Sequence, residues 1–132
     1  MVEVRGWTRA RFGLDPPADR TAVCGFSASG ELALVLGLRH PDVYGSIFSA
    51  SPGGGYRPPE VLPDALPRTY LLAGTEGPFF HANAARWATA LAAAGGEVVR
   101  VERVCRPPAH EAKSSAMPIP HANNEVSYGV RY

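Results

Sequence analysis

The chain has 132 residues, of which 45% are hydrophobic and 19% charged, and its formal net charge is +1. These values fit a globular chain with one ordinary domain rather than a disordered one. They exclude the strong basic field that draws in nucleic acid or an anionic membrane, and no stretch is apolar enough to span a membrane.

The first half of the chain alternates between helical and extended patterns. Residues 2–12 carry a loose helical stripe, and "TAVCG" at residues 21–25 predicts a short buried strand. Residues 29–40 predict a helix that is apolar on nearly all sides and ends before Pro41. "YGSIFSAS" then predicts a second strand.

The second half repeats this alternation and then loses it. Residues 52–68 are dense in Pro and Gly and predict an excursion over the surface. "TYLLAG" predicts a third strand, "PFFHANAARWATALAAAGG" a helix in which Trp87 and Leu91 face the core, and "EVVRVERV" a fourth strand. Residues 106–132 show no period, which predicts a poorly ordered tail.

Strands separated by helices favour an α/β fold, because each parallel connection needs a crossover of a dozen or more residues. We therefore expect a mostly parallel sheet of about four strands with helices on its faces, in a domain over residues 1–105. An unpaired strand edge with apolar flanks would favour self-association or pairing with another chain.

The chain contains two cysteines. Cys24 and Cys105 have no CxxC spacing, so they form neither a disulfide framework nor a zinc site, and Cys24 is expected to be buried in its strand. The start of the chain carries charges where a signal peptide needs an apolar core. We expect a cytoplasmic protein with no metal and no cofactor.

The segment "GFSASG" at residues 25–30 is the strongest chemical signal. A serine becomes a nucleophile when a sharp turn exposes its hydroxyl near a base and near backbone N–H groups, and a strand–Gly-x-Ser-x-Gly–helix turn provides this. Here Ser29 takes the place of the second glycine, and Gly30 follows one position late. The alternative is that Ser29 caps the helix and Ser27 is only turn chemistry.

These motifs and their order resemble a known family. "GFSASGELALVLGLRHPDVYGSIFSASPG", "TYLLAGTEGPFF" and "VVRVERV" are similar to the C-terminal half of the esterase D and enterochelin-esterase-like branch of the α/β-hydrolases, over roughly residues 2–104. The resemblance implies a partial α/β-hydrolase fold that lacks the N-terminal strands and the loop giving the second oxyanion donor. It implies a small-molecule ester as substrate.

The resemblance also assigns roles to single residues. It implies Ser27 as nucleophile, the backbone N–H of Ala28 as oxyanion donor, Glu76 as the orienting acid and His110 as the base. Glu76 stands one residue earlier than the family's acid, and an exposed loop carboxylate is the alternative. His110 follows "CRPPA", which departs from the family, and His121 is a second candidate.

Two functions follow from these assignments. One is a serine hydrolase of carboxylic esters or thioesters that forms an acyl-enzyme on Ser27, as a fragment with weak or no activity alone. The other is a catalytically inactive remnant that acts only as a folded interaction module. His40 and His81 are expected to be structural residues.

Overall fold

The computed structural model describes residues 2–104 of the chain. They form, in order, α1 (Val2–Phe12), the one-turn 3-10 helix η1 (Ala18–Arg20), β1 (Ala22–Phe26), α2 (Ala28–Arg39), β2 (Ser46–Ala50), β3 (Arg68–Gly74), α3 (Pro78–Ala93) and β4 (Val98–Arg103). The predicted helices and strands are confirmed, with ends that differ by a few residues. The predicted tail, with His110 and His121, lies outside the described residues.

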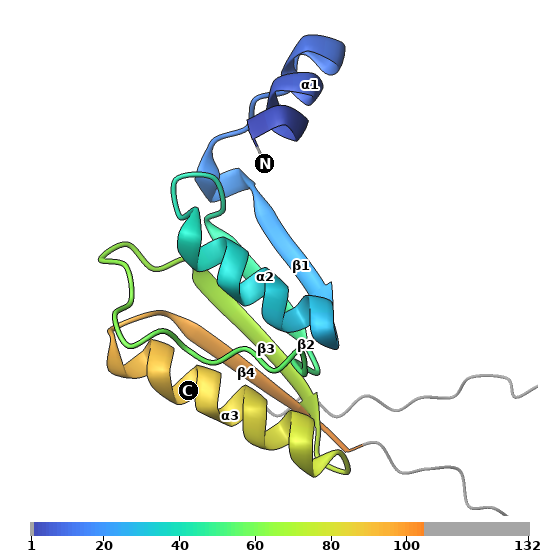
Figure 1. The fold of residues 1–132 in the computed structure, drawn as a ribbon, viewed down its shortest axis with the longest axis vertical. Coiled ribbons are helices and arrows are strands. Elements are labelled where there is room, and N and C mark those ends of the chain that lie inside the picture. The colour runs from blue at the N-terminus through green and yellow to red at the C-terminus, as the bar shows by residue number, and fades with distance from the viewer. Residues whose placement is uncertain (1, 105–132) are drawn as a thin grey trace, which may run out of the picture.

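The four strands form one parallel sheet in the order β1-β2-β3-β4 (Figure 1). Strands that follow one another in sequence are therefore neighbours in the sheet. Because all four run in the same direction, the segments that follow Phe26, Ala50 and Gly74 all leave from the same edge, the carboxyl edge. This confirms the α/β fold with a parallel sheet.

Both long helices lie on one face of the sheet (Figure 1). Helix α2 packs on β1 and β2, and α3 packs on β3 and β4. Trp87 and Leu91 of α3 are 0% and 1% exposed, which confirms their predicted place in the core. The core between this face and the two helices consists of Ala33, Leu34, Leu38, Ile47, Leu71, Trp87 and Leu91.

The connection between β2 and β3, residues 51–67, has no helix and runs between α2 and α3 (Figure 1). It is more than the predicted surface excursion, since Pro52 is fully buried and Leu62 and Leu66 pack against the core. The prolines of this segment limit its backbone freedom, which lowers the entropy cost of ordering it.

The other face of the sheet carries no helix within residues 2–104, although the sequence predicts helices on both faces. Its side chains come from alternate positions of the strands, and Phe26, Phe48 and Leu72 are 67%, 43% and 39% exposed. Cys24 points to this face and is exposed, so the prediction that it is buried is wrong. The strand pattern alone did not say which face is covered.

Helix α1 lies beyond the amino end of β1, away from the other two helices (Figure 1). Its contacts with the following turn are polar: Asp15 pairs with Arg9 and, at 3.1 Å, with the Nε of Arg5, while Arg5 also donates to the Pro16 carbonyl at 3.0 Å. No helix in the described part of the chain is both long enough and apolar enough to cross a membrane.

Candidate active site

Ser27 occupies the sharp turn between β1 and α2. Its φ of 57° and ψ of −125° lie in a backbone region that residues other than glycine rarely adopt. The turn is held by the Ser27 N–H, which donates to the Ala50 carbonyl at 2.9 Å, and by the Ser27 carbonyl, which accepts from Gly30 at 3.0 Å. Strand, strained serine and helix follow one another as the sequence predicts.

The glycines on either side allow the strand and the helix to meet. A Cβ added at Gly25 would lie 1.9 Å from the Ser29 carbonyl oxygen, closer than any real Cβ approaches. A Cβ added at Gly30 would lie 2.9 Å from the Ala50 carbonyl oxygen. Gly30 therefore makes the second close approach, while position 29 is exposed and accepts a serine.

The two serines of the turn have different surroundings. The Ser29 hydroxyl accepts from the Phe26 N–H at 3.0 Å and donates to the Phe26 carbonyl at 2.8 Å. It therefore does not cap α2, and Ser27, the N-cap residue, makes no side-chain cap bond either. Within residues 2–104 the Ser27 hydroxyl has no hydrogen-bond partner, which leaves it available to a substrate.

The backbone beside Ser27 presents a positive helix terminus. Ala28 is the first residue of α2, and the N–H groups of a first helical turn have no acceptor within the helix. The helix dipole adds a partial positive charge there. An oxygen that gains negative charge next to Ser27 would therefore meet a favourable environment.

A glycine-rich segment packs directly against this turn. The Gly53 N–H donates to the Ser27 carbonyl at 3.2 Å, and a Cβ added at Gly54 would lie 3.0 Å from the Ala28 carbonyl oxygen. A Cβ added at Gly53 would lie 2.4 Å from the ring of Phe80 and 3.2 Å from that of Phe79, at the start of α3. The Pro- and Gly-rich composition of residues 52–68 predicts a loop, but composition does not show what a loop covers.

Glu76 lies in the turn between β3 and α3, at the same edge of the sheet as Ser27. Its side chain is exposed and makes no hydrogen bond or ion pair within the described residues. One strand, β2, separates β3 from β1, so the two strand axes are about 10 Å apart. Glu76 therefore lies near the Ser27 turn, but within the described residues it makes no contact with a histidine side chain.

The histidines fall into two groups. His110 and His121 lie outside the described residues. Of the other two, His40 ends α2 at the opposite edge of the sheet from Ser27. The His81 Nε2 of α3 lies 3.2 Å from Glu102 Oε1 and 3.0 Å from Arg100 of β4. Because β4 is three strands from β1, this cluster stands at the far side of the sheet from Ser27.

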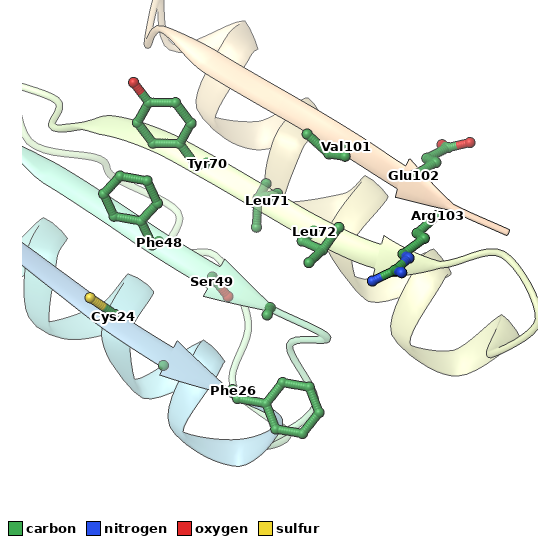
Figure 2. A pocket seen from close by; sticks show the side chains of 12 residues that line it. Cys24, Phe26, Phe48, Ser49, Tyr70, Leu71, Leu72, Val101, Glu102 and Arg103 are labelled. Atoms are coloured by element: carbon green, nitrogen blue, oxygen red, sulfur yellow. The ribbon is translucent and has the colours of Figure 1, made fainter. Parts of the chain in front are cut away.

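A shallow hollow of about 720 Å³ covers the helix-free face of the sheet (Figure 2). Phe48 and Tyr70 stack in it with ring centroids 4.4 Å apart, and Cys24 and Leu72 lie beside them. Phe26, the residue before Ser27, lies at its carboxyl end, as Figure 2 shows. Most of its lining side chains are apolar, and among the described residues its charged side chains, Glu102 and Arg103, come from β4, three strands from the strand that leads to Ser27.

Glu31 is a residue whose place the sequence did not reveal. It lies in the first turn of α2, near the positive end of the helix dipole, and its side chain is 0% exposed. The signal that could have found it is an acidic residue within a helix that is otherwise apolar on nearly every side.

Comparisons with known proteins agree with the fold. The model of one protein family, described as Putative esterase, matches residues 2–108. No curated protein matches the chain. The chain is similar to a solved enterochelin esterase from Shigella flexneri, with 22% identity and a TM-score of 0.64 over 76% of this chain and 29% of that one.

A second solved structure is the enterobactin esterase from Shigella flexneri in the presence of 2,3-dihydroxy-N-benzoyl-serine. The identity is 24% and the TM-score 0.58, over 75% of this chain and 30% of that one. At these identities the likeness concerns the fold. The chain spans less than a third of the length of either structure.

Proposed function

Because the chain belongs to the putative esterase family, we propose that it acts on carboxylic esters or thioesters of small molecules through an acyl-enzyme on Ser27. One observation carries the proposal. Ser27 combines a strained turn conformation with a hydroxyl that is free within residues 2–104, while the neighbouring Ser29 hydroxyl is engaged with Phe26. Of the two serines, Ser27 is the one suited to attack.

The proposed reaction has two halves. The Ser27 hydroxyl oxygen attacks the ester carbonyl carbon, its proton passes to the imidazole of His110, and the Ala28 N–H stabilises the oxyanion. The alcohol then leaves with the proton from His110. Water attacks the acyl-enzyme with His110 again as base, which releases the acid and restores Ser27.

Glu76 is proposed to orient the imidazole and to stabilise its charged form. Its support is its place at the carboxyl edge of the sheet, after β3, which is two strands from the β1 strand that leads to Ser27. Glu76→Gln is the variant suited to this role, because it keeps the shape of the side chain and removes its charge.

Turnover of p-nitrophenyl acetate by the full chain tests the nucleophile. Ser27→Ala is expected to abolish this turnover. Ser29→Ala is the matched control and should retain most of it, because the Ser29 hydroxyl bonds to the Phe26 backbone. Absence of turnover above buffer, or full turnover in Ser27→Ala, would reject the proposed activity.

The base is tested with a second matched pair. His110→Asn is expected to lower kcat by about a hundredfold or more, because general-base catalysis contributes on that order. His121→Asn is the control and should leave kcat unchanged. The opposite pattern would move the role from His110 to His121.

The helix-free face favours a second candidate function, that of an interaction module. Phe26, Phe48 and Leu72 form an exposed apolar surface, and β1 and β4 each have only one neighbouring strand in the described sheet. Such a face and such edges promote association of two copies. A concentration-dependent dimer in sedimentation, without ester turnover, would favour this candidate over the hydrolase.

A further inference from the structure

Glu31 places a fully buried carboxyl group four residues after Ser27, in the first turn of the same helix. Burying such a group costs free energy unless hydrogen bonds replace the lost water. Three donors meet it: the Tyr56 N–H at 2.8 Å from Oε2, the Asn83 side-chain amide, and the Trp87 indole N–H at 3.4 Å from Oε1. A carboxylate, which only accepts, fits this set of donors.

The three donors come from the two segments that border the proposed site. Tyr56 belongs to the stretch 52–56, whose Gly53 donates to the Ser27 carbonyl and whose Gly54 packs on Ala28. Asn83 also donates to the Pro52 carbonyl at 2.9 Å. Glu31 and Asn83 therefore hold both ends of this stretch while its middle rests on the serine turn.

Helix α3 joins the same cluster from the other side. It begins at Pro78, two residues after Glu76, and it carries both Asn83 and Trp87. The carboxyl group of Glu31 thus joins three segments: helix α2, which follows Ser27, the glycine-rich stretch 52–56, and helix α3, which follows Glu76.

We infer that Glu31 is a positioning residue for this site: it fixes the glycine-rich stretch and α3 against the first turn of α2, and so sets the geometry of Ser27 and the Ala28 N–H. The inference rests on the proposed function. A displacement of about 1 Å in a catalytic group can cost on the order of a hundredfold in rate. The tether therefore acts on the chemical step more than on substrate binding.

Glu31→Gln is the primary variant, because it keeps the volume of the side chain and puts an N–H₂ group where one carboxyl oxygen accepts. We expect kcat for p-nitrophenyl acetate to fall by about tenfold or more, the worth of one hydrogen bond to a charged group, with KM little changed. Amide hydrogen exchange at Tyr56 should accelerate by a similar factor, while Leu71 in β3 stays protected.

Leu38→Ala is the matched control, because Leu38 is buried on the same helix at the end far from Ser27. It should lower stability without lowering kcat at a temperature where both variants are folded. Should Glu31→Gln fail to fold, Asn83→Ala removes a donor to both Glu31 and the Pro52 carbonyl and is expected to lower kcat in the same way.

The outcomes separate this inference from the proposed function. An unmodified chain that does not turn over the ester rejects the proposed function itself. An active chain in which Glu31→Gln keeps its kcat, or loses no more than Leu38→Ala, overturns the positioning role. Faster exchange at Tyr56 with an unchanged kcat also overturns it, because it shows a purely structural tether.

Discussion

The two faces of the sheet are built from alternate residues of the same strands, yet they differ in what covers them. Ile47 points to the helices and is fully buried, whereas Phe48, the next residue in β2, points to the helix-free face and is 43% exposed. Both side chains are apolar. Residue type therefore sets the potential of a side chain to be buried, while the arrangement of the crossovers decides which face receives a helix layer within residues 2–104.

The serine turn belongs to the covered face. Its glycine contacts, the stretch 52–56 and the buried Glu31 all lie on the side of α2 and α3. The helix-free face contributes an apolar hollow and the ring of Phe26. We therefore expect large effects for substitutions on the covered face and small ones for substitutions on the helix-free face.

The largest effect is expected for Trp87→Ala. The side chain is 0% exposed and fills the core under α3, so its removal should lower the free energy of unfolding by about 3–5 kcal/mol. Urea unfolding followed by circular dichroism measures this. Leu72→Ala on the helix-free face is the control and should lower the free energy of unfolding by about 1 kcal/mol. Equal losses of stability in the two variants would contradict the distinction between the faces.

Gly25→Ala should come next. The new Cβ would collide with the Ser29 carbonyl oxygen at the turn, and relief requires a backbone shift that costs about 1–3 kcal/mol. Gly6→Ala, where nothing lies within 4 Å of an added Cβ, is the matched control and should be neutral or slightly stabilising. A neutral Gly25→Ala would contradict the close approach of strand and helix.

Phe48→Thr should change the free energy of unfolding by about 1 kcal/mol or less, since it removes only a half-exposed ring and its stack on Tyr70. It should also weaken any self-association in sedimentation experiments. Ile47→Thr, one residue away on the covered face, should instead cost about 2–4 kcal/mol. Tighter self-association in Phe48→Thr would exclude the helix-free face as the surface through which two copies associate.

The smallest effect concerns α1, which lies on neither face. The hydrogen bond from Arg9, aided by the charges of Arg9 and Arg5, holds the pKa of Asp15 below its ordinary value of 3.8. Because the folded pKa is lowered, the ion pairs contribute above pH 3.8 and are lost as the pH falls through the folded pKa. NMR titration should show this, and Arg9→Gln should return the pKa toward 3.8.

Much of the fold could be predicted because local patterns and their order agree. Apolar runs of strand length, a helix stopped by Pro41 and an alanine-rich helix before Gly95 each indicate one element, and their alternation indicates a parallel sheet. The covered face could not be predicted in this way. Cys24, Phe48 and Leu72 have the composition of buried strand residues and nevertheless face outward.

The site was predictable to the extent that it is local. The Ser27 turn follows from residues 25–30, because glycine spacing dictates a close strand–helix approach. The burial of Glu31 depends on Tyr56, Asn83 and Trp87, which are far away in sequence, so no short pattern contains it. The roles of Glu76 and His110 also depend on long-range geometry, and they stay predictions.

The most direct test of Ser27 as nucleophile is covalent labelling of the full chain with a fluorophosphonate, in which the serine oxygen bonds phosphorus and fluoride leaves. The tryptic peptide 21–39 contains both Ser27 and Ser29, and its fragmentation in a mass spectrometer assigns the label. We predict a label on Ser27 that is lost in Ser27→Ala and kept in Ser29→Ala. A label on another serine, or none under conditions in which an active serine esterase reacts, would contradict the account.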